Sequence, residues 1–139
     1  MLGLADIREW LKTLENKADN YYIGKLDNKS NKSIGVYQDK NTITPRIALG
    51  GRENSSYEVK AITILIHWNL NARETEEFSY NLYEELLKQN SVVINNHRIK
   101  MIKLITNEPI DVGTDEKNVY ERVIDLEFYY ERKGMKDNG

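Results

Sequence analysis

The residues best suited to chemistry in this sequence are few and far apart. Its two histidines are His67, inside a predicted strand, and His97, beside a predicted turn, and they lack the spacing of a metal-binding pair. A lone histidine in a strand is more often a packed side chain than a ligand. The chain has no cysteine, which excludes both a disulfide framework and a thiolate metal site.

Carboxylates gather in two places. Residues 111–116 superficially resemble a calcium loop but lack its ligand spacing and its terminal glutamate at about position twelve. A structured turn is the better interpretation, with Asp111 and Asp115 accepting backbone hydrogen bonds and Gly113 supplying the bend. Further acids alternate along one predicted strand, a pattern typical of a solvated face rather than of paired catalytic carboxylates: Glu121, Asp125, Glu127 and Glu131.

Other catalytic motifs are missing from the sequence. Gly50 and Gly51 lack the lysine and the serine or threonine that complete a phosphate-binding loop, and they precede no predicted helix. The serines fall in turns and helices without the strand-to-helix context of a nucleophile elbow. We therefore predict a protein that is not an enzyme and that uses no cofactor and no metal.

Length and charge limit the remaining classes. A chain of 139 residues is long enough for one domain, which we assign to residues 1–132, while we expect residues 133–139 to form a disordered tail. The net charge of −2 argues against a protein that holds nucleic acid mainly through phosphate contacts. No apolar run approaches the length of a membrane span or forms a signal-peptide core, so we expect no membrane association.

The stretch 58–88 organises the elements around it. Residues 59–68 are β-branched, aromatic or apolar on both faces, which predicts a strand in the middle of a sheet. Asn71 followed by Glu74 is typical of a capping box, in which each side chain accepts a free backbone N–H at the start of a helix. The helix is expected to continue to about Lys88, with an apolar stripe on one side.

Shorter elements precede and follow this unit. Hydrophobic periodicity predicts an amphipathic helix over about residues 3–16. Turn-forming residues between short apolar runs predict two hairpins: 21–26 with 33–38, and 92–94 with 97–105 around Asn95 and Asn96. Apolar residues change faces near Met101 and Ile102, which indicates a β-bulge or burial on both sides.

The last regular element is a long strand at 119–132, after a predicted loop at 106–118. We expect this strand to lie beside strand 59–68, so that Lys60 faces one of its acids. Because most connections are tight, the sequence predicts an α+β fold, a largely antiparallel sheet with two helices packed on one face. Two helices on one face leave the other face of strand 59–68 to be covered by a neighbouring subunit.

The long segment 39–57 has no sustained periodicity. Pro45 removes a backbone donor and Gly50-Gly51 permits unusual backbone conformations. Yet Ile47 and Leu49 are apolar, and Arg46 and Arg52 flank them. Two interpretations stay open. The segment is either a functional loop that becomes ordered on assembly, or a surface connection with a short edge strand at 46–49.

Several segments, taken in order, resemble a known family. They are residues 4–12, 32–37, 47–51, 63–68 with 71–76, and 109–115 leading to 119–122. Together they are similar to the small minor capsid, or tail terminator, proteins of phages and prophages of Gram-positive bacteria. The resemblance extends over about residues 2–132. It implies an α+β subunit that assembles into a ring, typically a hexamer, which caps the finished tail tube and presents a face to the head connector proteins.

The resemblance also implies where the protein acts. It would be made in the bacterial host cytoplasm and end in the neck of the virion, with DNA only passing through the channel of the ring. The contacts expected with neighbouring subunits or partners come from the two loops and from the outer side of the second helix: Arg46, Ile47, Leu49, Arg52, Tyr80, Asp111 and Asp115. The alternative is a monomeric ligand-binding module or small enzyme, with a pocket between the helices and the 39–57 loop.

Overall fold

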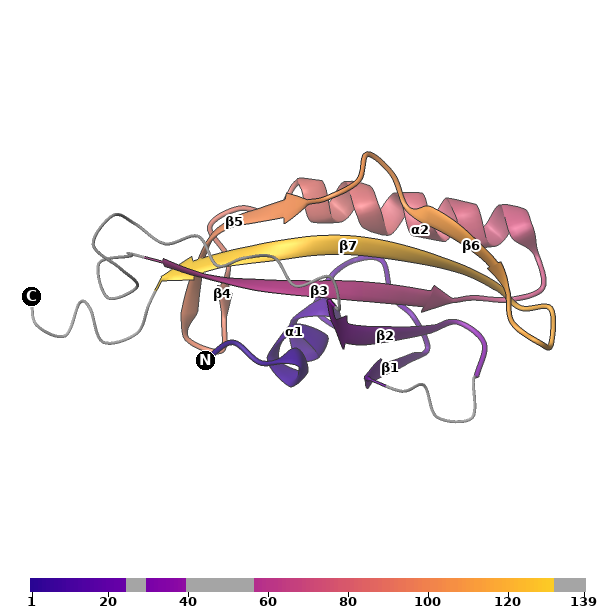
Figure 1. Ribbon diagram of the computed structural model, residues 1–139, viewed down its shortest axis with the longest axis horizontal. Helices are drawn as coiled ribbons and strands as arrows, with labels where there is room; N and C mark the ends of the chain where they lie inside the picture. The colour runs from indigo at the N-terminus through magenta and orange to yellow at the C-terminus, as the bar shows by residue number, and fades with distance from the viewer. Residues whose placement is uncertain (25–29, 40–56, 132–139) are drawn as a thin grey trace, which may run out of the picture.

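The computed structural model describes residues 1–24, 30–39 and 57–131, drawn in colour in Figure 1. Within these ranges the chain forms two helices and one large sheet. The helices are α1 (Leu4–Leu11) and α2 (Ala72–Leu87), and the strands are β1 (Asn20–Ile23), β2 (Ser33–Gln38), β3 (Tyr57–His67), β4 (Val93–Ile94), β5 (His97–Leu104), β6 (Ile110–Thr114) and β7 (Tyr120–Glu131). The predicted α+β class with a mostly antiparallel sheet is confirmed.

The strands follow the order β1-β2-β3-β7-β5-β4, and β6 pairs with β7 beside that path. β3 therefore lies inside the sheet, as its two-sided apolar sequence predicted. The two long strands run side by side through the molecule (Figure 1), antiparallel from the pair Tyr57 with Glu131 to the pair His67 with Glu121. In this register Lys60 lies opposite Phe128, so the prediction that it faces an acid directly across the ladder is wrong.

The hydrophobic core lies on the face formed by even-numbered residues of β3 and β7. Ile62, Ile64 and Ile66 are fully buried there, and the first two lie opposite the fully buried Leu126 and Ile124 of β7. Burying one such side chain stabilises a fold by about 1.5–3 kcal/mol. The same core cluster takes in buried residues from both helices: Ile7, Trp10, Leu11, Leu82, Tyr83 and Leu86. That both helices pack on one face of the sheet stays a prediction. The shared core cluster supports it.

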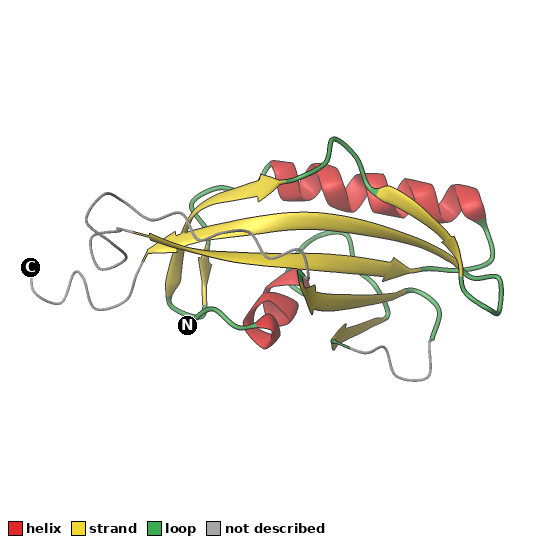
Figure 2. Cartoon of the chain, viewed as in Figure 1, coloured by secondary structure: helices red, strands yellow, loops and turns green. Residues whose placement is uncertain are grey.

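The two helices contact different parts of the sheet, as Figure 2 shows. α1 lies against β1, β2 and β4, while α2 lies against β7 and β5. α2 begins at the predicted cap, because the Asn71 side chain accepts the backbone N–H of Glu74 at 3.0 Å. The other half of the predicted capping box is wrong, because the Asn71 N–H donates to the side chain of Asn69. The Glu74 carboxylate accepts a hydrogen bond from the side chain of Asn69.

α1 is shorter than the predicted helix 3–16. Beyond Leu11 the N–H groups of Thr13 and Leu14 bond three residues back, to Trp10 and Leu11, which tightens the chain out of the α-helical path. Leu14 is nevertheless buried, so the apolar stripe in the sequence reports burial correctly but overestimates the helix.

The first predicted hairpin is wrong, because β1 pairs with β2 in parallel, from Asn20 with Ser33 to Ile23 with Val36. An antiparallel hairpin needs only a few residues between its strands, whereas a parallel pair needs a connection as long as the strand itself. The connection from β1 to β2, residues 24–32, is long enough for parallel pairing. The second hairpin is confirmed. Asn95 and Asn96 both have positive φ, at 47° and 65°, as a tight primed turn requires, and the register of β5 shifts between Ile99 and Met101.

The predicted loop 106–118 contains strand β6, which the sequence analysis missed. β5 pairs only with the C-terminal half of β7, from Leu126 to Tyr130. The free edge of β7 from Tyr120 to Val123 is then occupied by residues 110–114. All five residues of β6 are exposed, and Pro109, Gly113 and the acids of this segment favoured a loop in the sequence.

Candidate functional site

The sheet has a second face, which we call the open face, and it carries the odd-numbered residues of β3 and β7. The β3 residues on it are only partly buried: Val59, Ala61, Thr63 and Leu65. On the core side Ile62, Ile64 and Ile66 are fully buried, whereas these four residues are not, although His67 at the end of β3 is buried on the open face. Partial exposure of an apolar strand face suits a surface that another molecule covers.

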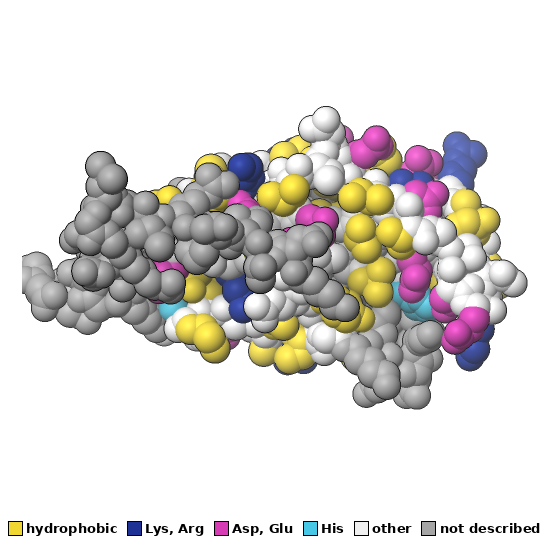
Figure 3. Space-filling view, viewed as in Figure 1, with side chains coloured by type: hydrophobic (Ala, Val, Ile, Leu, Met, Phe, Trp, Pro, Cys, Tyr) yellow, Lys and Arg dark blue, Asp and Glu magenta, His cyan; other side chains and the backbone are white. Residues whose placement is uncertain are grey.

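Three exposed apolar side chains lie on β5, just after it and on β6. We call them the apolar row: Met101, Ile105 and Ile110. Their exposed fractions are 49%, 43% and 38%. Met101 lies opposite Tyr129, and Ile110 opposite Val123, which places both on the open face. Figure 3 views the molecule as Figure 1 does, and hydrophobic side chains gather near β6 and β7.

The acidic side of β7 differs from the solvated face that the sequence predicted. Glu127 is only 1% exposed, and its carboxylate accepts the hydroxyl of the buried Tyr129 at 2.7 Å. Asp125 accepts the hydroxyl of Thr63, directly opposite on β3, at 2.6 Å. These acids stabilise the sheet through paired polar contacts, because a buried carboxylate is tolerated only with hydrogen-bond partners.

The predicted interface residues fall into two groups. Arg46, Ile47, Leu49 and Arg52 lie outside the described residues, as does the tail 133–139. Tyr80, Asp111 and Asp115 are described. Asp111 is exposed, accepts the backbone N–H of Gly113 at 2.8 Å and lies 3.9 Å from Arg122. The predicted backbone hydrogen bonds to Asp111 and Asp115 are present, but Gly113, at a φ of 91°, lies at a bulge in β6 rather than in a turn.

Tyr80 has a partner within its own chain. Its hydroxyl donates to the carboxylate of Glu108, and this hydrogen bond raises the pKa of the Tyr80 phenol. One turn further along α2, the Tyr83 hydroxyl donates to the carbonyl of Thr106, and burial raises the pKa of that phenol. The two tyrosines therefore hold the segment before β6 against α2. Both phenols are neutral near neutral pH.

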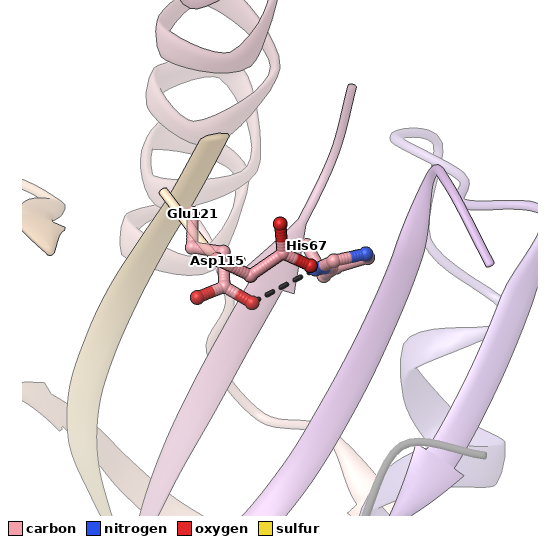
Figure 4. A group of neighbouring side chains, drawn as sticks. All are labelled: His67, Asp115 and Glu121. Carbon is pink, nitrogen blue, oxygen red and sulfur yellow. Dashed lines mark hydrogen bonds and ion pairs between the residues drawn. The ribbon is translucent and has the colours of Figure 1, made fainter. Parts of the chain in front are cut away.

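His67, Asp115 and Glu121 form the one cluster of mixed metal-ligand types that the described residues contain. Figure 4 shows their side chains pointing toward one another from the end of β3, the turn before β7 and the start of β7. The His67 Nδ1 atom lies 2.8 Å from Glu121 Oε2 and 3.8 Å from Asp115 Oδ2. The sequence predicted a packed histidine, and His67 is indeed fully buried, but its acidic neighbours went unnoticed.

A backbone cage fixes the Asp115 carboxylate. Its Oδ1 atom accepts the N–H groups of Lys117 and Val119 at 2.9 and 3.0 Å, as the predicted turn required. Asp115 therefore stabilises the turn through Oδ1, while its Oδ2 lies near His67. Glu121 reaches His67 because the two are directly opposite in the β3–β7 register. The sequence contained one signal for this cluster, the predicted pairing of strand 59–68 with strand 119–132.

A polar hollow of about 500 Å³ lies between the end of α1 and the second half of α2. Its described lining contains carboxylates, amides and one amine: Glu15, Asn16, Asn81, Glu84, Glu85, Lys88 and Gln89. Glu85 already binds Glu15 and Asn16. The described lining holds no histidine, serine, threonine or cysteine.

Comparison with known families shows what this chain is related to. The sequence model of the family described as "Bacteriophage tail terminator protein" matches residues 1–132. The chain belongs to this family. The match spans every described range and ends one residue before the predicted tail, which begins at residue 133. For this tail terminator chain, the resemblance predicted from short ordered segments is thus confirmed at the level of the family.

Two further findings complete the comparison. No curated protein sequence matches the tail terminator chain. In the part of the chain that the structure describes, neither helix is long and apolar enough to cross a membrane. Membership of the family supports a structural role in a phage tail.

Proposed function

We propose that this chain is a non-enzymatic virion subunit that assembles into a ring, with six copies as the expected number. The ring would cap the tail tube protein and present its opposite face to the head connector proteins. DNA would pass through its channel without being held. In this proposal the subunit is made in the cytoplasm of the bacterial host and acts in the neck of the virion.

The apolar row carries this proposal. Met101, Ile105 and Ile110 are each more than a third exposed, and Ile110 lies opposite the partly buried Val123 of β7. A ring needs a heterologous contact, in which one patch of a subunit meets a different patch of the next. We place the apolar row in such a contact, because apolar area removed from water stabilises association.

The polar part of the proposed contact comes from Arg46, Ile47, Leu49 and Arg52, together with the described Tyr80, Asp111 and Asp115. Among the described three, Asp111 offers the most accessible carboxylate, with its side chain 59% exposed, whereas the Asp115 side chain is 8% exposed. We therefore expect an arginine of one subunit to pair with Asp111 of the next. Such rim pairs set register and specificity more than affinity.

The test is the mass of the particle in solution. The wild-type chain, alone and mixed with its tail tube protein, should form a ring that is visible by electron microscopy and that has a defined mass. Met101→Glu and Ile110→Glu should each weaken ring formation, because they place a carboxylate in an apolar contact. Leu70→Glu is the matched control, since Leu70 is 66% exposed at the turn before α2.

Each outcome bears on the proposal. Ring formation that survives Leu70→Glu but is lost in both row variants, with unchanged melting temperatures, supports it. A chain that stays monomeric at every concentration, both alone and with the tube protein, would contradict it. Normal rings from both row variants would remove the apolar row from the contact.

A further inference from the structure

We propose that His67, Asp115 and Glu121 form a binding site for a divalent transition-metal cation of the zinc class. Their ligand atoms all lie within 4.8 Å of one another. They come from three separate segments, the end of β3, the turn that follows β6 and the start of β7. A cation at their centre would therefore join three parts of the chain that otherwise meet through hydrogen bonds.

The distances suit such an ion. A tetrahedral ion with bonds of about 2.0–2.2 Å to nitrogen and oxygen separates its ligand atoms by about 3.4 Å. The two distances from His67 Nδ1, 2.8 Å to Glu121 Oε2 and 3.8 Å to Asp115 Oδ2, lie on either side of that value. Shifts of less than about 1 Å would bring these groups into coordination geometry.

The ligands are already oriented by the fold. The Lys117 and Val119 N–H groups hold Asp115 Oδ1, which leaves Oδ2 directed at His67. Strand pairing fixes Glu121 opposite His67, and Gly113 of β6 pairs with Glu121 from the other side. Outer hydrogen bonds of this kind orient ligating groups and raise the affinity of metal sites.

Charge and donor type select the cation. A neutral imidazole with two carboxylates carries two negative charges, which a divalent cation balances in a site where His67 is fully buried. Imidazole favours zinc, copper, iron and nickel over calcium and magnesium, which prefer all-oxygen sites. The Glu121 side chain keeps 20% exposure, so an ion and a completing water can reach the site from that side.

The experiment uses the full chain, freed of metal with a chelator and then titrated with Zn²⁺ by calorimetry. We expect one ion per chain and a rise in melting temperature that the chelator reverses. Replacing Zn²⁺ by Co²⁺ should give the visible absorption of a cobalt ion with nitrogen and oxygen ligands. His67→Gln and Glu121→Gln should each weaken binding by about tenfold or more.

His97→Gln is the matched control. His97 is also buried, at 2% exposure, but it stacks edge-on against Tyr130 and belongs to no such cluster among the residues that the structure describes. The His97→Gln variant should bind Zn²⁺ as the wild type does. If His67→Gln fails to fold without metal, Glu121→Gln at the more exposed position decides the question. No saturable binding by the wild type, or unchanged binding by Glu121→Gln, would overturn the site and leave the three residues as a hydrogen-bonded brace.

Discussion

The carboxylate of Glu85 accepts the backbone N–H of Asn16 at 2.9 Å, although the two residues are 69 positions apart. It also accepts the N–H of Glu15 and the side-chain amide of Asn16, both at 2.6 Å. A single side chain on α2 thus satisfies the backbone just beyond α1. This contact joins α2 to the segment after α1. In a longer α1 the same backbone N–H groups would have bonded to carbonyls of the helix itself.

The first prediction concerns the ionisation of Glu85. Partial burial opposes its ionisation, but the hydrogen bonds from Glu15 and Asn16 outweigh it and hold the pKa of the carboxyl below the ordinary value of 4.5. A lowered pKa in the folded state adds stability above pH 4.5, and this stability is lost as the pH falls through the folded-state pKa.

Glu85→Gln should therefore reduce the free energy of unfolding near neutral pH by about 1–3 kcal/mol. The difference from the wild type should shrink as the pH falls below 4.5. Urea denaturation across this range measures both effects, with Glu84→Gln, an exposed neighbour on α2, as the control. A difference that stays constant with pH would show that the charge of Glu85 is not what stabilises the contact.

The second prediction concerns the core. Ile64 is fully buried on β3 and lies opposite the fully buried Ile124. Ile64→Asp should unfold the domain, because an unpaired carboxylate there costs several kcal/mol out of a typical total of about 5–15 kcal/mol. Circular dichroism and thermal melting measure the loss. Leu65→Asp, on the partly exposed open face, should be milder, and equal effects would contradict the assignment of the two faces.

The third prediction concerns Gly113 at the bulge of β6. Its φ of 91° is unfavourable for residues with a Cβ, although no atom lies within 4 Å of the position that a Cβ would take. Gly113→Ala should therefore destabilise the domain by about 1 kcal/mol or more through backbone strain alone. Gly113→Asn, which tolerates positive φ better, should lose less. Equal losses in thermal melts would argue against strain as the cause.

The fourth prediction concerns assembly and tests the proposed rim pair. Arg52→Glu should weaken ring formation, and Asp111→Arg in the same chain should restore it, because the swap recreates an attractive pair between subunits. Analytical ultracentrifugation reads out both steps. Arg73→Glu is the matched charge reversal on an 87% exposed site of α2. Normal assembly by Arg52→Glu would remove this arginine from the contact.

The sequence by itself determined the elements whose signal is local. Residues that are apolar on both faces placed β3 inside the sheet, Asn71 capped α2, and Asn95 with Asn96 made the tight turn, as predicted. Each of these depends on propensities of neighbouring residues, which the chain carries wherever it folds. The ordered motifs also identified the family correctly.

Only the tertiary structure decided which segments meet. The parallel pairing of β1 with β2, the position of β6 on the free edge of β7, and the burial of Glu127 all depend on distant segments. Strand pairing uses backbone N–H and C=O groups that nearly every residue has. Which strand pairs with which edge is therefore decided by the arrangement of the whole sheet rather than by local sequence. For the same reason His67 looked solitary in the sequence, while the register of β3 on β7 brings it to Glu121.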